Sequence, residues 1–81
     1  MSQPLYKIEA IWDREAQVWV AQSNDVPGLA TEANDLESLT DKLKIIIPEL
    51  LQLNDLISTK HVSNIAFELI SYRQESIQVA G

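Results

Sequence analysis

The sequence contains no cysteine and a single histidine, and these absences exclude two common kinds of site. Without cysteine the chain forms neither a disulfide framework nor a thiolate metal site. His61 alone cannot supply a metal site built from several histidines of one chain. Gly28 and Gly81 are the only glycines, so a glycine-rich phosphate-binding loop is also missing. We therefore expect no metal and no cofactor.

Long apolar runs and excess basic charge are absent as well. The longest aliphatic run covers residues 45–47, and no basic segment followed by an apolar core opens the chain. These features predict neither a membrane span nor a signal peptide. The formal net charge of −6 disfavours direct binding to nucleic acid, because phosphate recognition needs a basic surface. A cytoplasmic protein that contacts neither nucleic acid nor membrane is the expectation.

What is present indicates one small folded domain. The chain has 81 residues and is 46% hydrophobic, which is typical of a globular domain rather than a disordered segment. We expect a single domain over residues 1–81. A domain this small buries a modest share of its surface, so partners add usefully to its stability.

Hydrophobic periodicity predicts four strands and one main helix. Residues 5–12, 18–23 and 63–72 carry the strand pattern, and the last of these has room to continue to Ile77 and Val79. Pro27 and Gly28 have the signature of a type II turn, after which residues 29–33 form a short third strand antiparallel to the second. The predicted fold class is α+β, with the order β-β-β-α-β, a small antiparallel sheet and one helix packed on one face.

The helix is predicted over residues 36–53, from apolar residues at intervals of three and four. Either Asn34 or Asp35 caps its beginning. Pro48 leaves two possibilities open, a single kinked helix or a break at which Pro48 begins a second helix. Ile47 is a poor cap for a new helix, which favours the kinked helix.

Apolar residues are too numerous for one helix to cover. The second and fourth strands carry apolar side chains on both faces. The sequence therefore does not decide which face of the sheet the helix covers. A contiguous apolar patch usually marks an interface. We therefore predict self-association, a two-fold dimer first, through an uncovered face that carries Trp19, Ile70 and Tyr72.

Catalytic patterns are weak. Four carboxylates lie near predicted strand ends, where two of them would suit acid–base chemistry or a divalent metal: Asp13, Glu15, Asp25 and Glu32. Asp and Glu occupy such turn and cap positions by default, however. His61 lies in a polar connector, and no serine has a nucleophile-elbow motif around it. We assign no catalytic residue and expect a protein that is not an enzyme. A degenerate carboxylate-based, nuclease-like enzyme is the weaker alternative.

All of the net charge lies in one stretch of the sequence. Residues 15–41 contain no Lys or Arg and six acids, namely Glu15, Asp25, Glu32, Asp35, Glu37 and Asp41, whereas acids and bases cancel elsewhere. Such a stretch is compatible with a basic protein partner, or with solubility alone.

The same stretch resembles HicB-like antitoxin domains. The run from Val18 to Leu39, with its Asp-x-Pro-Gly-Leu turn and acid-capped helix start, carries the resemblance at Asp25, Pro27, Gly28, Glu37 and Leu39. The segment IAFELISYR is similar to a small uncharacterised bacterial family related to HicB. The resemblance covers roughly residues 5–73 and implies the β-β-β-α-β fold and dimer formation. In two-gene systems it also implies docking onto a small basic RNA-cleaving toxin.

We therefore expect a non-enzymatic, acidic protein-binding module. Its candidate partner-binding residues are Asp25, Pro27, Gly28, Glu32, Asp35, Glu37 and Asp41. Full antitoxins of this type carry a DNA-binding domain after the last strand, whereas only SIQVAG remains here, which puts operator binding in doubt. A structural homo-oligomer is the alternative function.

Overall fold

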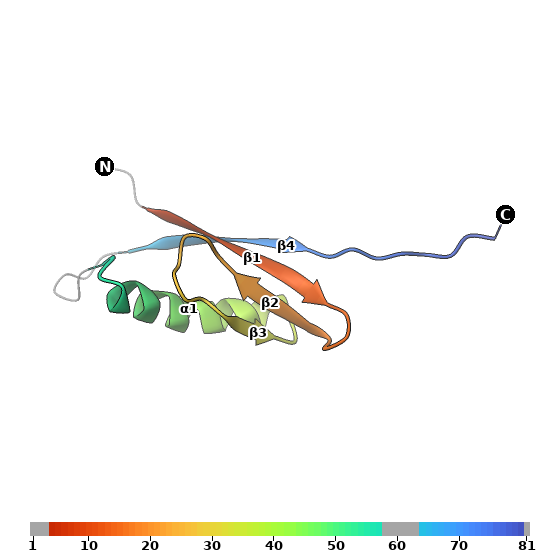
Figure 1. The fold of residues 1–81 in the computed structure, drawn as a ribbon, viewed down its shortest axis with the longest axis horizontal. Helices are drawn as coiled ribbons and strands as arrows, with labels where there is room; N and C mark the ends of the chain where they lie inside the picture. The colour runs from red at the N-terminus through yellow and green to blue at the C-terminus, as the bar shows by residue number, and fades with distance from the viewer. Residues whose placement is uncertain (1–3, 58–63, 81) are drawn as a thin grey trace.

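The computed structural model describes residues 4–57 and 64–80 (Figure 1). Its elements in chain order are β1 (Leu5–Asp13), β2 (Val18–Gln22), β3 (Thr31–Ala33), α1 (Leu36–Leu53) and β4 (Ala66–Tyr72). The predicted β-β-β-α-β order is confirmed. The third strand begins two residues later than predicted. The fourth begins at Ala66, and Ser63 lies outside the described residues.

The four strands form one mixed sheet in the order β3-β2-β1-β4. The β1/β2 and β2/β3 pairs are antiparallel, as predicted for the third strand. β4 runs parallel to β1, so the expectation of an antiparallel sheet is wrong for this pair. The physical reason is the crossover, because α1 carries the chain back along the sheet before β4 begins, and parallel neighbours require such a connection.

A single face of the sheet is covered by α1, and the core lies between them (Figure 1). The helix buries a stripe spaced by four residues, which is the spacing of one helical face. Opposite it, the register places Ala10 beside Ala21 and Trp19 beside Ala33 on the covered face. The core comprises Ile8, Ala10, Trp19, Ala21, Val26, Ala33, Leu39, Leu43, Ile47 and Leu51.

The helix continues without interruption from Leu36 to Leu53 and includes Pro48. The prediction of a single helix is therefore confirmed, and a second helix beginning at Pro48 is excluded. Asp35, rather than Asn34, is the N-cap: its backbone is extended and its side chain accepts a hydrogen bond from the Ser38 N–H. At the other end Asn54 caps the helix, and Asp55 adopts a positive φ of 56°.

The opposite face of the sheet is not covered by α1. Ile11 pairs with Val20 of β2 on one side and with Tyr72 of β4 on the other, so these three residues form an apolar row across three strands. Ile70 shares this face with Tyr72, because the two are separated by two positions of one strand. Trp19 does not, since it is 8% exposed and belongs to the core under α1. The predicted patch of Trp19, Ile70 and Tyr72 is therefore wrong at Trp19.

Within the described residues, no helix has both the length and the apolar composition needed to cross a bilayer.

Candidate functional site

The loop between β2 and β3 is tied to the beginning of β1 by short hydrogen bonds. The Ser23 hydroxyl donates to the carbonyl oxygen of Lys7 at 2.6 Å and accepts from the N–H groups of Asp25 and Val26 at 3.0 and 3.2 Å. In return, the Lys7 N–H donates to the carboxylate of Asp25 at 2.8 Å. Asp25 therefore stabilises the loop as well as contributing charge to the surface.

The turn at residues 26–29 has the geometry that its sequence predicts. The Leu29 N–H donates to the Val26 carbonyl at 3.3 Å, and Gly28 has φ of +80°, as a type II turn requires at its third position. Val26 is fully buried and anchors the turn in the core. A Cβ atom at Gly28 would lie 3.6 Å from Leu50 of α1, an ordinary contact distance, so glycine is needed there for conformation rather than for space.

The beginning of α1 is fixed by Asp35. Its carboxylate accepts hydrogen bonds from the Ser38 N–H at 2.7 Å and from the Ser38 hydroxyl at 3.1 Å. These bonds to the charged form lower the pKa of Asp35 below its ordinary value. Lys42 lies one turn after Ser38 on the same side of the helix. Its Nζ donates to the carbonyl oxygen of Glu32 at 2.6 Å and so joins α1 to β3.

These elements surround a shallow depression of about 350 Å³ at the helix start. Its lining combines the carboxyl residues Glu32 and Asp35 with a single base, Lys42, and is completed by Val18, Ala33, Asn34 and Ser38. Because Asp35 already accepts from the helix-terminal N–H of Ser38, the end of the helix is occupied by the protein's own anion. The depression therefore suits a cationic side chain better than a phosphate.

The acids of residues 15–41 all lie at the surface of the domain. Each of Glu15, Asp25, Glu32, Asp35, Glu37 and Asp41 is exposed. In the described ranges, the ion pairs are those of Glu75 with Arg14 at 3.7 Å and with Arg73 at 3.0 Å. None of them involves an acid of residues 15–41. These acids therefore keep their negative charge in the isolated chain.

The predicted partner-binding residues fall into three groups. Asp25, Pro27 and Gly28 belong to the loop whose turn lies near Leu50, in the C-terminal half of α1. Glu32 and Asp35 lie together at the depression beside the helix start. Glu37 and Asp41 are exposed on the first turns of α1, separated by four residues and hence on one side of the helix.

The strand-end carboxylates predicted for acid–base chemistry have structural roles in two cases. Asp13 accepts from the N–H groups of Glu15 and Ala16 at 3.0 and 3.1 Å, closing the β1–β2 turn, and Asp25 holds the loop described above. No cluster of three or more His, Cys, Asp or Glu residues in the described ranges is arranged to hold a metal ion. His61 lies outside the described residues.

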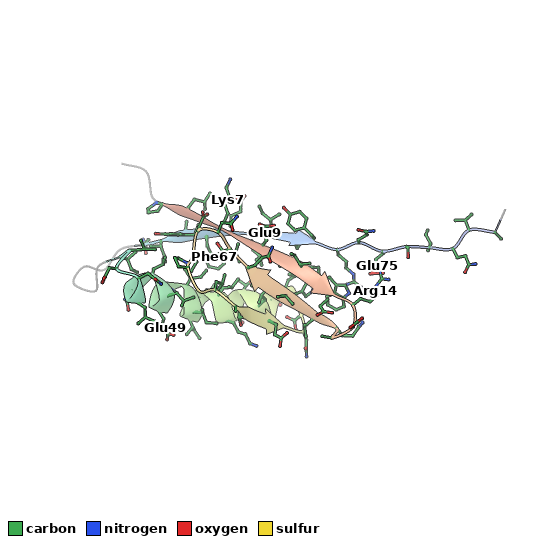
Figure 2. All side chains as sticks on the ribbon, in the orientation of Figure 1. Lys7, Glu9, Arg14, Glu49, Phe67 and Glu75 are labelled. Carbon is green, nitrogen blue, oxygen red and sulfur yellow. The ribbon has the colours of Figure 1, made fainter. Side chains whose placement is uncertain are left out.

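One arrangement was not predicted from the sequence, and it lies where β4 ends. The guanidinium of Arg73 stacks on the ring of Trp12 at 4.4 Å, and Trp12 in turn contacts Trp19, with ring centroids 5.2 Å apart. Arg14 donates to the carbonyl oxygen of Gln74 at 3.0 Å, and Figure 2 shows Arg14 and Glu75 side by side at this point. The sequence signal was weak, because Arg73 and Gln74 lie about 60 positions after the residues that they contact.

Comparisons with known proteins agree with this fold. A solved structure of a hypothetical protein, TTHA1013, from the extremely thermophilic bacterium Thermus thermophilus, is 42% identical and superposes with a TM-score of 0.71. The match covers 91% of this chain and all of that one. No protein with a curated description matches the chain. Residues 5–80 match the family described as a domain of unknown function, DUF1902. The chain therefore belongs to the DUF1902 family.

Proposed function

We propose that this chain is a non-enzymatic protein-binding domain that binds a small basic protein through the exposed acids of residues 15–41. The observation that carries the proposal is the set of six exposed acids in residues 15–41, none of which forms an ion pair in the described parts of the chain. A basic partner would supply positive charges to pair with these acids. Complementary electrostatic fields also speed association and fix the relative orientation of the two proteins.

The kind of partner follows from the resemblance of residues 18–39 to HicB-like antitoxin domains. In such a pair, the acidic domain covers the basic RNA-binding face of a small RNA-cleaving toxin and so neutralises it. The two elements that carry the resemblance are the turn at Pro27 and Gly28 and the helix start at Asp35, and both have the local geometry that their residues predict. The depression at Glu32 and Asp35 is suited to a Lys or Arg side chain of the partner.

The test is capture of the tagged full chain from its native cells at low salt, with the retained proteins identified by mass spectrometry. We expect one small basic protein in about equimolar amount, released by raised salt because exposed charge pairs are screened. The retained protein should cleave RNA when alone and stop cleaving when the chain is added back. Retention of no basic protein, or of one whose RNA cleavage is unaffected by the chain, would contradict the proposal.

A matched pair of variants locates the contact. Glu37→Gln with Asp41→Asn removes two charges from the acidic surface, whereas Glu49→Gln with Glu68→Gln removes two exposed acids elsewhere. Both change the net charge equally, from −6 to −4. If each lost pair is worth about 0.2–1 kcal/mol, the first variant weakens binding between about 2-fold and about 30-fold. The second should bind as the wild type does, and equal weakening by the two would show only an effect of net charge.

A further inference from the structure

The chain does not stop at β4 but continues as an extended segment that leaves the domain. We define residues 73–80 as the C-terminal arm. All eight residues are exposed, and Figure 1 shows the arm running on from β4 beyond the sheet and the helix. It is the main reason why the molecule measures 62 Å along its longest axis but 26 and 19 Å along the others. An extended segment in this position has its backbone groups available for pairing.

The root of the arm is held by the domain, and this sets the direction of the rest. Arg73 stacks on Trp12, Gln74 accepts a hydrogen bond from Arg14, and Glu75 forms ion pairs with both arginines. From Ser76 to Ala80 the structure shows no further hydrogen bond or ion pair to residues 4–57 or 64–75. The contacts at residues 73–75 therefore set the direction in which residues 76–80 leave the domain.

The side chains of the arm alternate as those of a half-buried strand do. Ile77 is 90% exposed and Val79 is 80% exposed, and polar residues lie between and before them. Counting by two from β4, Ile77 and Val79 fall on the side of Phe67 and Leu69, which pack against the core under α1. The arm thus has an apolar side that nothing in the described part of its own domain covers.

β4 offers a surface of matching length and chemistry. It is an edge strand, paired with β1 on one side, and no described strand lies on its other side. Unpaired edges readily recruit another strand. β4 has seven residues and the arm has eight. Between β4 and α1 lies a largely apolar groove of about 120 Å³, lined by Phe67, Ile65, Leu43, Ile47, Pro48 and Lys44.

We propose that the C-terminal arm of one copy pairs antiparallel with the outer edge of β4 in a second copy, and that the exchange is reciprocal about a two-fold axis near Arg73. With Arg73 of the two copies opposite each other, Ile77 lies beside the second copy's Leu69 and Val79 beside the second copy's Phe67. Residues directly opposite in an antiparallel pair share one face, so both apolar side chains extend the layer beneath α1. Two four-stranded sheets become one of eight strands.

The charge of this surface and the matching lengths of β4 and the arm favour a second copy of the chain as the partner. Residues 64–80 contain two acids, Glu68 and Glu75, and one base, Arg73, so this surface is nearly neutral in a chain of net charge −6. Two copies can approach here without bringing their acidic surfaces together. Reciprocal exchange also covers both β4 edges and both arms at once, and closes the assembly at two copies. The inference does not depend on the proposed function, which uses a different surface.

Sedimentation of the full chain across a concentration series tests the proposal. We expect a dimer for the wild type. Ile77→Asn with Val79→Asn should weaken the dimer by about 100-fold or more, because both apolar side chains lose their burial. Ser76→Asn with Gln78→Asn alters the other side of the same segment and should leave the dimer intact. Neither Ile77 nor Val79 supports the monomer fold, so the helical signal in far-ultraviolet circular dichroism should be unchanged in both variants.

A disulfide cross-link tests the pairing itself, since the wild type has no cysteine. In the proposed register, residue 68 of one copy lies opposite residue 78 of the other. Within one extended chain these positions are about 33 Å apart, far beyond the roughly 4.4–6.8 Å between the Cα atoms of a disulfide. Glu68→Cys with Gln78→Cys should therefore give a covalent dimer on mild oxidation, whereas Glu49→Cys with Gln78→Cys should not.

Three results would overturn the proposal. The first is a wild type that stays monomeric throughout the concentration series. The second is a dimer that Ile77→Asn with Val79→Asn does not weaken, which would place the interface elsewhere, such as on the open face at Ile11 and Tyr72. The third is cross-linking at residues 68 and 78 that does not exceed that of the control pair.

Discussion

Ile47 and Ile45 provide a direct test of which side of α1 is buried. They lie two residues apart on the same helix, yet Ile47 is 1% exposed in the core and Ile45 is 65% exposed. Replacing each in turn by alanine removes the same atoms and makes the same change in helix propensity. A difference between the two variants therefore reports the difference in their surroundings.

The expected magnitudes follow from burial. Each replacement removes three carbon groups, worth about 2.4 kcal/mol at about 0.8 kcal/mol per buried group. At Ile47 the cavity left in the core brings the loss to about 2–5 kcal/mol. At Ile45 about two thirds of the side chain is already in water, so the loss is about 0.8 kcal/mol, and the better helix propensity of alanine returns about 0.4 kcal/mol. Because the gain in helix propensity is common to both positions, the two variants should differ by about 1–4 kcal/mol.

The assay is urea unfolding followed by circular dichroism, at one protein concentration for all samples. A domain of 81 residues has a free energy of unfolding of roughly 4–12 kcal/mol, so the expected difference between the two variants is a large share of the total stability. Ile47→Ala should lower the midpoint at an unchanged slope, the mark of a pure stability effect. If Ile45→Ala proves as costly as Ile47→Ala, the side of α1 that carries Ile45 is buried in an assembly, and the reasoning that only the side facing the sheet is buried is refuted.

Three further predictions test the loop, the cap and the root of the arm. Because hydrogen bonds lower the folded-state pKa of Asp35, its charge stabilises the fold above the ordinary aspartate pKa of 3.8 and ceases to do so as the pH falls through the lowered value. Asp35→Asn should accordingly have a lower melting temperature than the wild type at neutral pH, and the gap should close in acid; a gap independent of pH would contradict this. Gly28→Ala should lower the free energy of unfolding in urea by about 1–2 kcal/mol, because alanine is strained at φ of +80°. Ala30→Gly in the same loop is the control and should lower it by less. Arg73→Gln should cost about 0.5–1 kcal/mol by loss of the stack on Trp12, and the tryptophan fluorescence should change with it; an unchanged spectrum would argue against the stack.

Local signals in the sequence were sufficient wherever neighbouring residues decide the conformation. The type II turn follows from Pro27 and Gly28, whose backbone preferences need no tertiary contact. The helix follows from its apolar spacing and from Asp35, which caps it within its own first turn. The order of elements and the two ends of α1 were thus set by interactions of short range.

The surface was harder to predict, because apolar side chains on both faces of a strand carry no signal of which face is buried. Trp19 and Val20 are both apolar neighbours in β2, and only the packing of α1 decides that Trp19 lies in the core and Val20 outside. For the same reason the sequence placed all three residues on the uncovered face, where the structure has Ile70 and Tyr72 but not Trp19.

The charge of residues 15–41 was evident from the sequence, whereas its arrangement came from the fold. Tertiary structure separates the loop at Asp25 from the depression at Glu32 and Asp35, because β3 and α1 carry these residues to different places. It also places β4 at the edge of the sheet, parallel to β1, and directs the C-terminal arm away from the domain. Composition and local preference thus determined the elements and the charge, while long-range pairing and packing decided which surfaces stayed open.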